Sequence, residues 1–322
     1  MRRFIRTVGR PLAVMTAGSV IVLAGCVASQ PSQPSQLSHQ LLPSQPSALA
    51  VVPVAATVSA RPTKVLVVVL ENRGVSATLR LMPFLASQSR GYAKASNYHA
   101  VKHPSLPNYL IMAGGSTFGV TDSKAPAAHR LGGSSVFGQI IAKGRSAKTY
   151  AEGMTTNCQQ KNTGRYAVRH NPWTYFASSR ERSLCLRYDV PLGTRTNGPL
   201  QRDVAAGQLP TFSMVVPDLC HDAHDCRLAT ADAWLKPWLR QIEAGPDFRA
   251  GRLAVVVTFD EDGGTLGNQV LTAVMHPARR GVVVTRRLDH YSLSATASRL
   301  AWTTPLRRAI GTPDFLRAFR LR

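Results

Sequence analysis

The chain has 322 residues, enough for one large domain or two small ones, and its 44% hydrophobic content can form a sizeable core. Its 39 Lys and Arg residues against 17 Asp and Glu residues give a formal net charge of +22, which favours partners such as anionic lipids or acidic envelope polymers. Because no dense Lys/Arg run is interleaved with aromatic residues, nucleic-acid binding is not expected as the main role.

Residues 1–25 are predicted to form a lipoprotein-type signal peptide. An arginine-rich start precedes an apolar run that is too short and too interrupted by Gly and Ser for a membrane span. The run ends in Leu-Ala-Gly-Cys at 23–26, which resembles a bacterial lipobox and implies cleavage before Cys26 and lipid attachment to its thiol. The alternative is an ordinary secretory signal with an incidental Cys26. We therefore expect export, with anchoring at the outer face of the bacterial membrane if Cys26 is lipidated.

Residues 26–60 are rich in Ser, Pro and Gln and cannot form a core, so they are predicted to be a flexible tether. The folded domain is predicted to span 61–322.

The four cysteines of this domain are an even number, which is typical of disulfides in an oxidising compartment. Of the three pairings we favour Cys158–Cys185 and Cys220–Cys226, the second of which closes a small loop. Metal thiolates are the alternative, but the chain has no C-x-x-C pair to support them.

The apolar, β-branched runs at 65–70 and 253–259 are typical of strands buried on both faces of a parallel sheet. A shorter run of the same kind lies at 212–216. Helix-like apolar spacing appears between the strands, at 81–90, 134–144 and 231–245. These elements predict an α/β domain.

Acidic residues follow both long strands directly. Glu71 and Asn72 end the first run, and Asp260 and Glu261 end the second. A single acidic ending is often a helix cap or a turn residue. Two endings at the same edge of a sheet bring carboxylates together at an electrostatic cost that a divalent cation relieves with oxygen ligands. The pattern therefore favours a metal site at this edge.

The stretch HPSLPNYLIMAGG, residues 103–115, has two interpretations. In the structural one, Ser105 caps a helix, Pro107 lies in its first turn and the glycines end it. In the chemical one, the Ser105 hydroxyl also lies where the backbone N–H groups and dipole of a helix N-terminus favour a phosphoryl group.

Eight motifs occur in one order: VLENRG, HPSLPNYLIMAGG, YAEGM, RHNPW, PDLCHDAHDC, ADAWL, VVTFDEDGG and DHYSL. Together they resemble the bacterial phosphoesterase family of acid phosphatases and phospholipases C, in the alkaline-phosphatase-like superfamily. The resemblance covers the chain from about 64 to 293. It implies a three-layer α/β/α sandwich with a largely parallel central sheet and a hydrolase that acts on phosphate esters.

The resemblance also implies roles for individual residues. It places the metal ligands at Glu71, Asn72, Asp260 and Glu261, with Ser105 as a nucleophile that also contacts the metal. It places His170 and His290 around the phosphate as catalytic groups, and we expect substrate contacts from His103, Asn108, Asp222 and His224. A structural hydrogen-bonding role is the alternative for each histidine.

The sequence departs from the family pattern in three places. No histidine follows DEDGG closely, which favours one divalent ion (Mg, Ca, Mn or Zn) over two. The segment after His290 lacks an acidic residue that the family pattern leads us to expect, so the C-terminal helix is expected to differ. No further domain is evident, which favours an acid phosphatase over a phospholipase C.

The expected reaction is in-line attack by Ser105 on phosphorus, followed by hydrolysis of the phosphoserine by water. Three alternatives stay open: a phosphodiesterase or phospholipase C-like enzyme, an inactive lipid-anchored binding protein, and an envelope protein that binds anionic polymers through its basic surface.

Overall fold

The computed structural model describes residues 58–59, 61–264 and 266–321. The predicted signal peptide, Cys26 and all but two residues of the predicted tether lie outside the described residues. Among the described helices, none has both the length and the apolar character needed to cross a bilayer.

Eight strands form one sheet in the order β5-β4-β6-β1-β7-β8-β2-β9. Their bounds are β1 Lys64–Leu70, β2 Ala93–Ala95, β4 Ala147–Ala151, β5 Asp189–Pro191, β6 Phe212–Val216, β7 Leu253–Phe259, β8 Thr272–Met275 and β9 Val282–Val284. β8 alone of these described strands runs antiparallel to its neighbours. β3 Tyr98–His99 and β10 Leu288–Asp289 pair separately. The predicted largely parallel sheet is confirmed.

The two long apolar runs are the neighbouring strands β1 and β7, at the centre of the sheet. They pair in parallel from Lys64 with Leu253 to Leu70 with Phe259. Apart from Lys64, every residue of both strands is buried. Side chains that are apolar on both faces are stable only under helices on both sides, which explains the central position. The bounds predicted for β6 and β7 are confirmed, and β1 begins one residue earlier than predicted.

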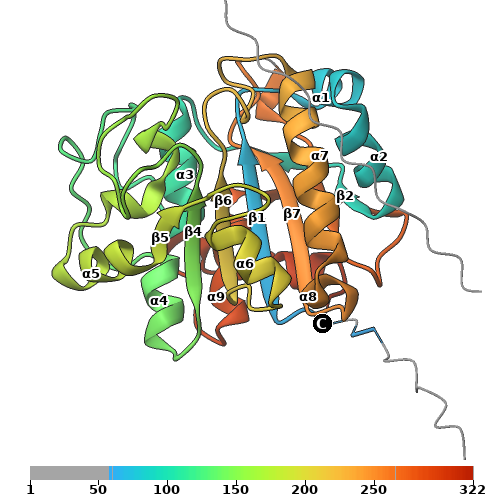
Figure 1. Cartoon of the computed structure of the whole chain (residues 1–322). Coiled ribbons are helices and arrows are strands. Elements are labelled where there is room, and N and C mark those ends of the chain that lie inside the picture. Colours follow the sequence, from blue (N-terminus) through green and yellow to red (C-terminus); the bar gives the residue numbers. More distant parts are fainter. Residues whose placement is uncertain (1–57, 60, 265, 322) are drawn as a thin grey trace, which may run out of the picture. The chain divides into compact units, whose positions relative to one another are not determined.

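Helices cover both faces of the sheet, which gives three layers. Their bounds are α1 Val75–Leu81, α2 Pro83–Gly91, α3 Ser105–Gly114, α4 Val136–Ala142, α5 Ser179–Tyr188, α6 Pro199–Ala205, α7 Leu228–Ala244, α8 Pro246–Arg249, α9 His290–Leu300 and α10 Phe315–Ala318. In Figure 1, α6, α7 and α8 lie in front of the sheet, and α3, α4 and α9 lie behind it. The helices predicted at 81–90, 134–144 and 231–245 correspond to α2, α4 and α7.

Helix α3 begins at Ser105, and its N-cap is Pro104, which offers no side-chain cap. The interpretation of Ser105 as an N-cap is therefore wrong, because its hydroxyl points to another residue, described below. Pro107 lies in the first turn as predicted. Gly115 ends the helix at φ +66°, a left-handed conformation that glycine adopts without strain, and its N–H donates to the Ile111 carbonyl at 2.8 Å.

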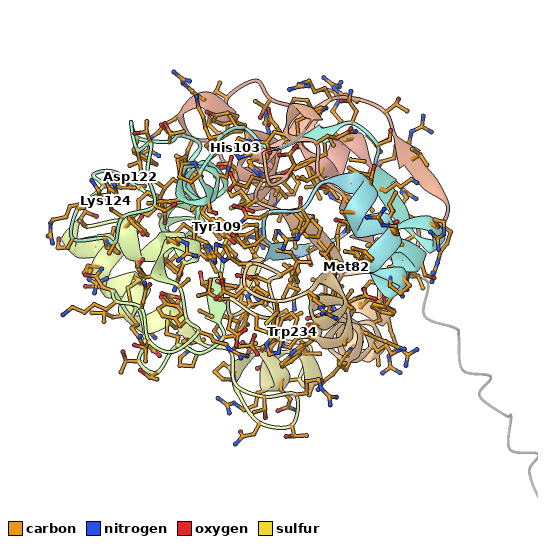
Figure 2. The ribbon with its side chains drawn as sticks, turned by 90° about the horizontal axis from the view of Figure 1, so that it is seen from above. Met82, His103, Tyr109, Asp122, Lys124 and Trp234 are labelled. Atoms are coloured by element: carbon orange, nitrogen blue, oxygen red, sulfur yellow. A yellow bond between two sulfur atoms is a disulfide. The ribbon has the colours of Figure 1, made fainter. Side chains whose placement is uncertain are left out.

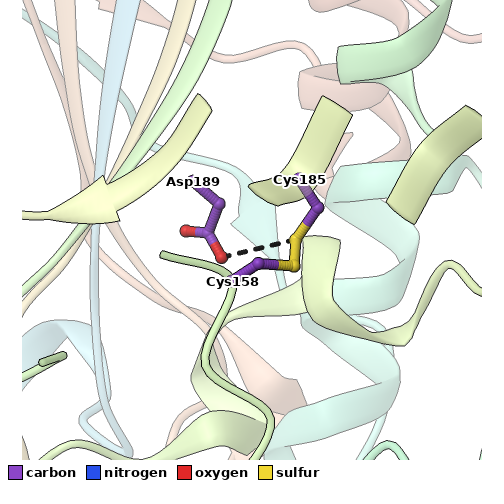
Figure 3. Close-up of side chains that lie close together, drawn as sticks. All are labelled: Cys158, Cys185 and Asp189. Atoms are coloured by element: carbon purple, nitrogen blue, oxygen red, sulfur yellow. Dashed lines mark hydrogen bonds between the residues drawn. A yellow bond between two sulfur atoms is a disulfide. The ribbon is translucent and has the colours of Figure 1, made fainter. Parts of the chain in front are cut away.

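Two disulfides form, Cys158–Cys185 and Cys220–Cys226, so the favoured pairing is confirmed and the metal-thiolate alternative is wrong. Figure 3 shows the first of them beside Asp189, at the start of β5. Disulfides persist in oxidising compartments, so the pair indicates an extracellular location.

Candidate active site

The acidic groups that end β1 and β7 meet at one edge of the sheet. Leu70 and Phe259 are paired, so Glu71 and Asp260 leave the two strands side by side. The Asn72 backbone N–H donates to Asp260 Oδ1 at 3.1 Å, which links the two turns. Figure 2 shows this edge from above, with His103 and Tyr109 labelled near it.

Two hydroxyls of α3 hold the Glu71 carboxylate. Ser105 Oγ donates to Oε2 at 2.9 Å, and the Tyr109 hydroxyl donates to Oε1 at 2.7 Å. Ser105 and Tyr109 are four residues apart and therefore face the same side of the helix. All three side chains are buried, and Ser105 keeps only 4% of its surface exposed. The predicted juxtaposition of Ser105 with the β1 acid is thus present in the geometry.

His170 and Asp222 complete a buried cluster with Glu71. His170 Nδ1 lies 3.1 Å from Asp222 Oδ2, and its Nε2 lies 3.2 Å from Glu71 Oε1. The His170 ring stacks on Tyr109 with centroids 5.2 Å apart. Donor atoms of Glu71, His170 and Asp222 lie within 4.8 Å of one another, so the three could hold a metal ion. Asp222, expected as a substrate contact, lies among the potential ligands.

Burial and mutual repulsion make this cluster electrostatically costly. Burial, followed by the charges of Asp260 and Asp222, raises the pKa of Glu71 well above its ordinary value. Burial and then Glu261 raise the pKa of Asp260 to about 7. Burial raises the pKa of Asp222 to about 8. A bound cation would relieve the repulsion that contributes to these shifts.

Two buried oxygens also point to a cation. Asn72 Oδ1 and Asp260 Oδ2 have no hydrogen-bond partner among the described residues. An unsatisfied buried oxygen costs about 1–3 kcal/mol, which a hard metal ion recovers by coordination. Asn72 adopts φ +53°, a left-handed conformation that asparagine tolerates better than most residues. The residues present therefore fit a divalent cation.

His103 lies at the mouth of the site, with its side chain 46% exposed. Its Nδ1 is 2.7 Å from Glu261 Oε2, and its Nε2 is 3.7 Å from Asp262 Oδ1. Burial, followed by the charge of Asp262, raises the pKa of Glu261 to about 7. Glu261 thus contacts a solvent-accessible imidazole.

His290 is buried with both ring nitrogens engaged. The Asp260 carbonyl can only accept, so the Nε2 atom 2.6 Å away carries the proton. Nδ1 then accepts from the Tyr98 hydroxyl at 2.8 Å. Burial lowers the pKa of His290 to about 4, which keeps it neutral. This geometry holds the Asp260 backbone in place.

The Asn108 side chain forms hydrogen bonds with the backbone of the preceding loop. Its Oδ1 accepts from the N–H groups of Val101 and Lys102 at 3.1 and 2.9 Å, and its Nδ2 donates to the Lys102 carbonyl at 2.7 Å. These contacts fix the loop that leads into Ser105. His224 borders the cluster: its backbone N–H donates to Asp222 Oδ1 at 2.7 Å, and its ring centroid lies 5.9 Å from that of His170. Its Nε2 lies 3.1 Å from Arg169 Nη2 and its Nδ1 lies 2.6 Å from Asp225 Oδ1.

Sequence reasoning missed Tyr109. The position of Tyr109, one helical turn after Ser105, is a signal that could have identified it. A second group at this edge, Glu152, Asp218 and His221, follows β4 and β6. His221 Nδ1 lies within 3.3 Å of both carboxylates, and the Asp218 N–H donates to Glu152. Trp234 Nε1 also donates to Glu152, at 3.0 Å.

Comparisons with known proteins match the chain to one family and to named relatives. The model of the phosphoesterase family matches residues 78–300. A phosphatidylinositol-3-phosphatase of Mycobacterium tuberculosis is 31% identical over 82% of this chain and 85% of its own length. An acid phosphatase of Aspergillus fumigatus is 27% identical over 67% of this chain, which spans about half (49%) of that relative.

Solved structures establish the fold. A member of the alkaline phosphatase superfamily from Vibrio parahaemolyticus superposes with a TM-score of 0.55 at 14% identity, over 80% of this chain and 72% of that one. A lipoteichoic acid synthase from Listeria monocytogenes superposes with a TM-score of 0.52 at 10% identity, over 82% and 77% of the two chains.

Proposed function

Because this chain belongs to the phosphoesterase family and is a hydrolase of phosphate esters, we propose that it acts through a phosphoserine intermediate on Ser105. The observation that carries the proposal is the 2.9 Å hydrogen bond from Ser105 Oγ to Glu71 Oε2, at the start of a buried helix and beside an acidic cluster. In the first step the Ser105 hydroxyl proton passes to the hydrogen-bonded Glu71 carboxylate, the Oγ–P bond forms, and the bond to the leaving oxygen breaks, with that oxygen taking a proton from solvent. In the second step a water oxygen bonds to phosphorus, the P–Oγ bond breaks, and Ser105 Oγ regains a proton.

The proposal includes one divalent cation. The residues proposed to hold it are Glu71, Asn72, Ser105, Asp260 and Glu261. The orphaned oxygens of Asn72 and Asp260 support this set, and Asp222 and His170 lie close enough to contribute. When bound, the cation supplies charge neutralisation for the serine alkoxide and the phosphoryl oxygens. Oxygen donors suit Mg, Ca or Mn, whereas a contribution from His170 suits Zn.

The chain's own groups then have distinct tasks. Glu71 orients the Ser105 hydroxyl through the hydrogen bond above, and the amino end of α3 favours the negative charge of the phosphoryl group. His103, exposed at the mouth, can contact the substrate. His290 and Asn108 act as positioning residues, because their polar atoms are occupied by the backbone and by Tyr98.

We propose an acid-phosphatase-like activity on phosphate monoesters, in line with the names of the two relatives. Activity on diesters, including phospholipase C-like activity, is the alternative. We further propose a catalytic domain at 61–322 and export of the chain with lipid attached at Cys26. The two disulfides support an extracellular location for the domain.

The test is an assay of a generic aryl phosphate, its bis ester and phosphatidylcholine, after chelation and after add-back of single metals. The proposal expects metal-dependent turnover of the monoester that Ser105→Ala abolishes. Turnover of the monoester by Ser105→Ala at the parent rate would show that the nucleophile is another group. Metal binding without turnover of any ester would identify a binding protein.

A further inference from the structure

The edge of the sheet opposite the candidate active site carries an exposed tryptophan. Trp302, two residues after α9, is 69% exposed, more than any other large apolar side chain in the described part of the chain. Its backbone adopts φ +56°, a left-handed conformation that is unusual for a bulky residue. A strained backbone that presents an apolar side chain to solvent suggests that the side chain has a partner.

Arginines surround this tryptophan. The Arg61 guanidinium lies 4.8 Å from the centroid of the Trp302 ring. Arg61, Arg299 and Trp302 line two cavities of about 350 and 310 Å³, which also share Leu316, and Arg145 lines the second. Within the described residues, no carboxylate forms an ion pair with any of these three arginines. We call Arg61, Arg145, Arg299 and Trp302 the basic aromatic face.

The basic aromatic face lies at the end of the sheet opposite to the proposed catalytic groups. Arg61 precedes β1 and Arg145 precedes β4, so both lie at the amino ends of parallel strands. Glu71 and Asp260 lie at the carboxyl ends, one strand length away, or about 20 Å. In Figure 1 the strand β7 points upward, and the blue segment that leads into β1 lies at the lower edge.

We propose that the basic aromatic face docks on a bilayer that contains anionic phospholipids. Arginine guanidinium groups bind lipid phosphates, and each basic residue near an anionic surface contributes about 1 kcal/mol. Tryptophan prefers the interface between headgroups and acyl chains. A soluble polyanion would satisfy the arginines, but it would leave Trp302 exposed, so the bilayer accounts for more of the observations.

Docking in this way sets the orientation of the enzyme. The active site would then face away from the membrane and toward phosphate esters in the surrounding solution. This orientation rests on the proposed function. The described part of the domain begins beside Arg61, on the side proposed to face the bilayer.

The experiment uses tryptophan fluorescence of the full chain, mixed with vesicles of brominated phosphatidylglycerol and phosphatidylethanolamine. Bromine quenches only indoles that reach the bilayer, so the readout reports the docked face even if another segment also binds. The variants are Trp302→Phe, Arg61→Gln and Arg299→Gln. Trp234→Phe is the matched control, since Trp234 lies at the opposite edge of the sheet, where its Nε1 donates to Glu152 at 3.0 Å. Arg286→Gln is the charge control, an exposed arginine that lines a cavity beside β9.

The proposal expects quenching that Trp302→Phe removes and Trp234→Phe retains. Each arginine substitution should raise the lipid concentration at half-maximal quenching about fivefold, and Arg286→Gln should leave it unchanged. Quenching that depends on Trp234, or none at all, would overturn the proposal. The proposal would also be overturned if soluble polyphosphate bound the chain as tightly as the vesicles do and if Trp302→Phe did not weaken that binding. Turnover of an aryl phosphate in the same samples tests the proposed function separately.

Discussion

The Tyr109 hydroxyl donates a hydrogen bond to Glu71 Oε1 at 2.7 Å, while Ser105 binds the other oxygen of the same carboxylate. One helix thus fixes both oxygens of the acid that ends β1. Outer hydrogen bonds of this kind orient a ligand and set its basicity.

Tyr109→Phe is therefore expected to weaken cation affinity about tenfold or more while retaining the fold. A titration of activity and of melting temperature with the activating metal measures this. Tyr175→Phe is the matched control, because that buried hydroxyl donates to the Lys124 carbonyl away from the cluster. Equal affinities for the two variants would contradict a positioning role for Tyr109.

Chelation should lower the unfolding free energy, because Glu71, Asp222 and Asp260 then face one another without a counter-charge. Asp260→Asn removes one of these charges and should stabilise the chelated protein by about 1 kcal/mol or more. The same variant should lose the stabilisation that added metal gives the parent. Denaturant unfolding with and without chelator measures both effects. If Asp260→Asn destabilised the chelated protein, the hydrogen bond that Asp260 accepts from Asn72 would outweigh the repulsion between the carboxylates.

The sequence was sufficient to predict the pair of strand ends that underlies the site. Continuous β-branched runs identified β1 and β7, and the geometry of parallel sheets then required Glu71 and Asp260 to share an edge. The direction of a side chain from a loop or short helix could not be predicted in the same way. His170 and Asp222 reach Glu71 through contacts made between distant parts of the chain.

The hydrogen-bond partners of buried polar side chains could not be predicted from the sequence either. His290 and Asn108 were expected to contact the phosphate and the substrate, yet their polar atoms bind Asp260, Tyr98 and the backbone of the loop before Ser105. Whether a polar side chain serves ligand or backbone depends on nearby unsatisfied backbone groups, and these appear only in the folded chain.

The two disulfides should have different effects when removed. Cys220–Cys226 spans six residues and should contribute about 2 kcal/mol, whereas Cys158–Cys185 spans 27 and should contribute about 3–4 kcal/mol. The short loop carries Asp222, whose carbonyl accepts the Glu71 N–H at 2.8 Å. Replacing the short pair with alanines should therefore lower kcat more and stability less than replacing the long pair. The reverse order in kinetics and denaturant unfolding would contradict this assignment.

Asp189 gives a prediction for pH. Burial raises its pKa from 3.8 to about 8, so the folded state retains a proton that the unfolded state loses. Stability from this group is full below pH 3.8 and falls as the pH rises toward 8. Asp189→Asn mimics the protonated form, so its stability relative to the parent should rise across that range and then level off. Urea unfolding at a series of pH values tests this, and a difference independent of pH would contradict it.

The most direct measurement of the central claim is acid quenching of the enzyme during turnover of an aryl phosphate, followed by peptide mass spectrometry. The account predicts one phosphate on the peptide that carries Ser105, and loss of both phosphate and turnover, by about a thousandfold or more, in Ser105→Ala. Phosphate on another residue, or full turnover by Ser105→Ala, would contradict it.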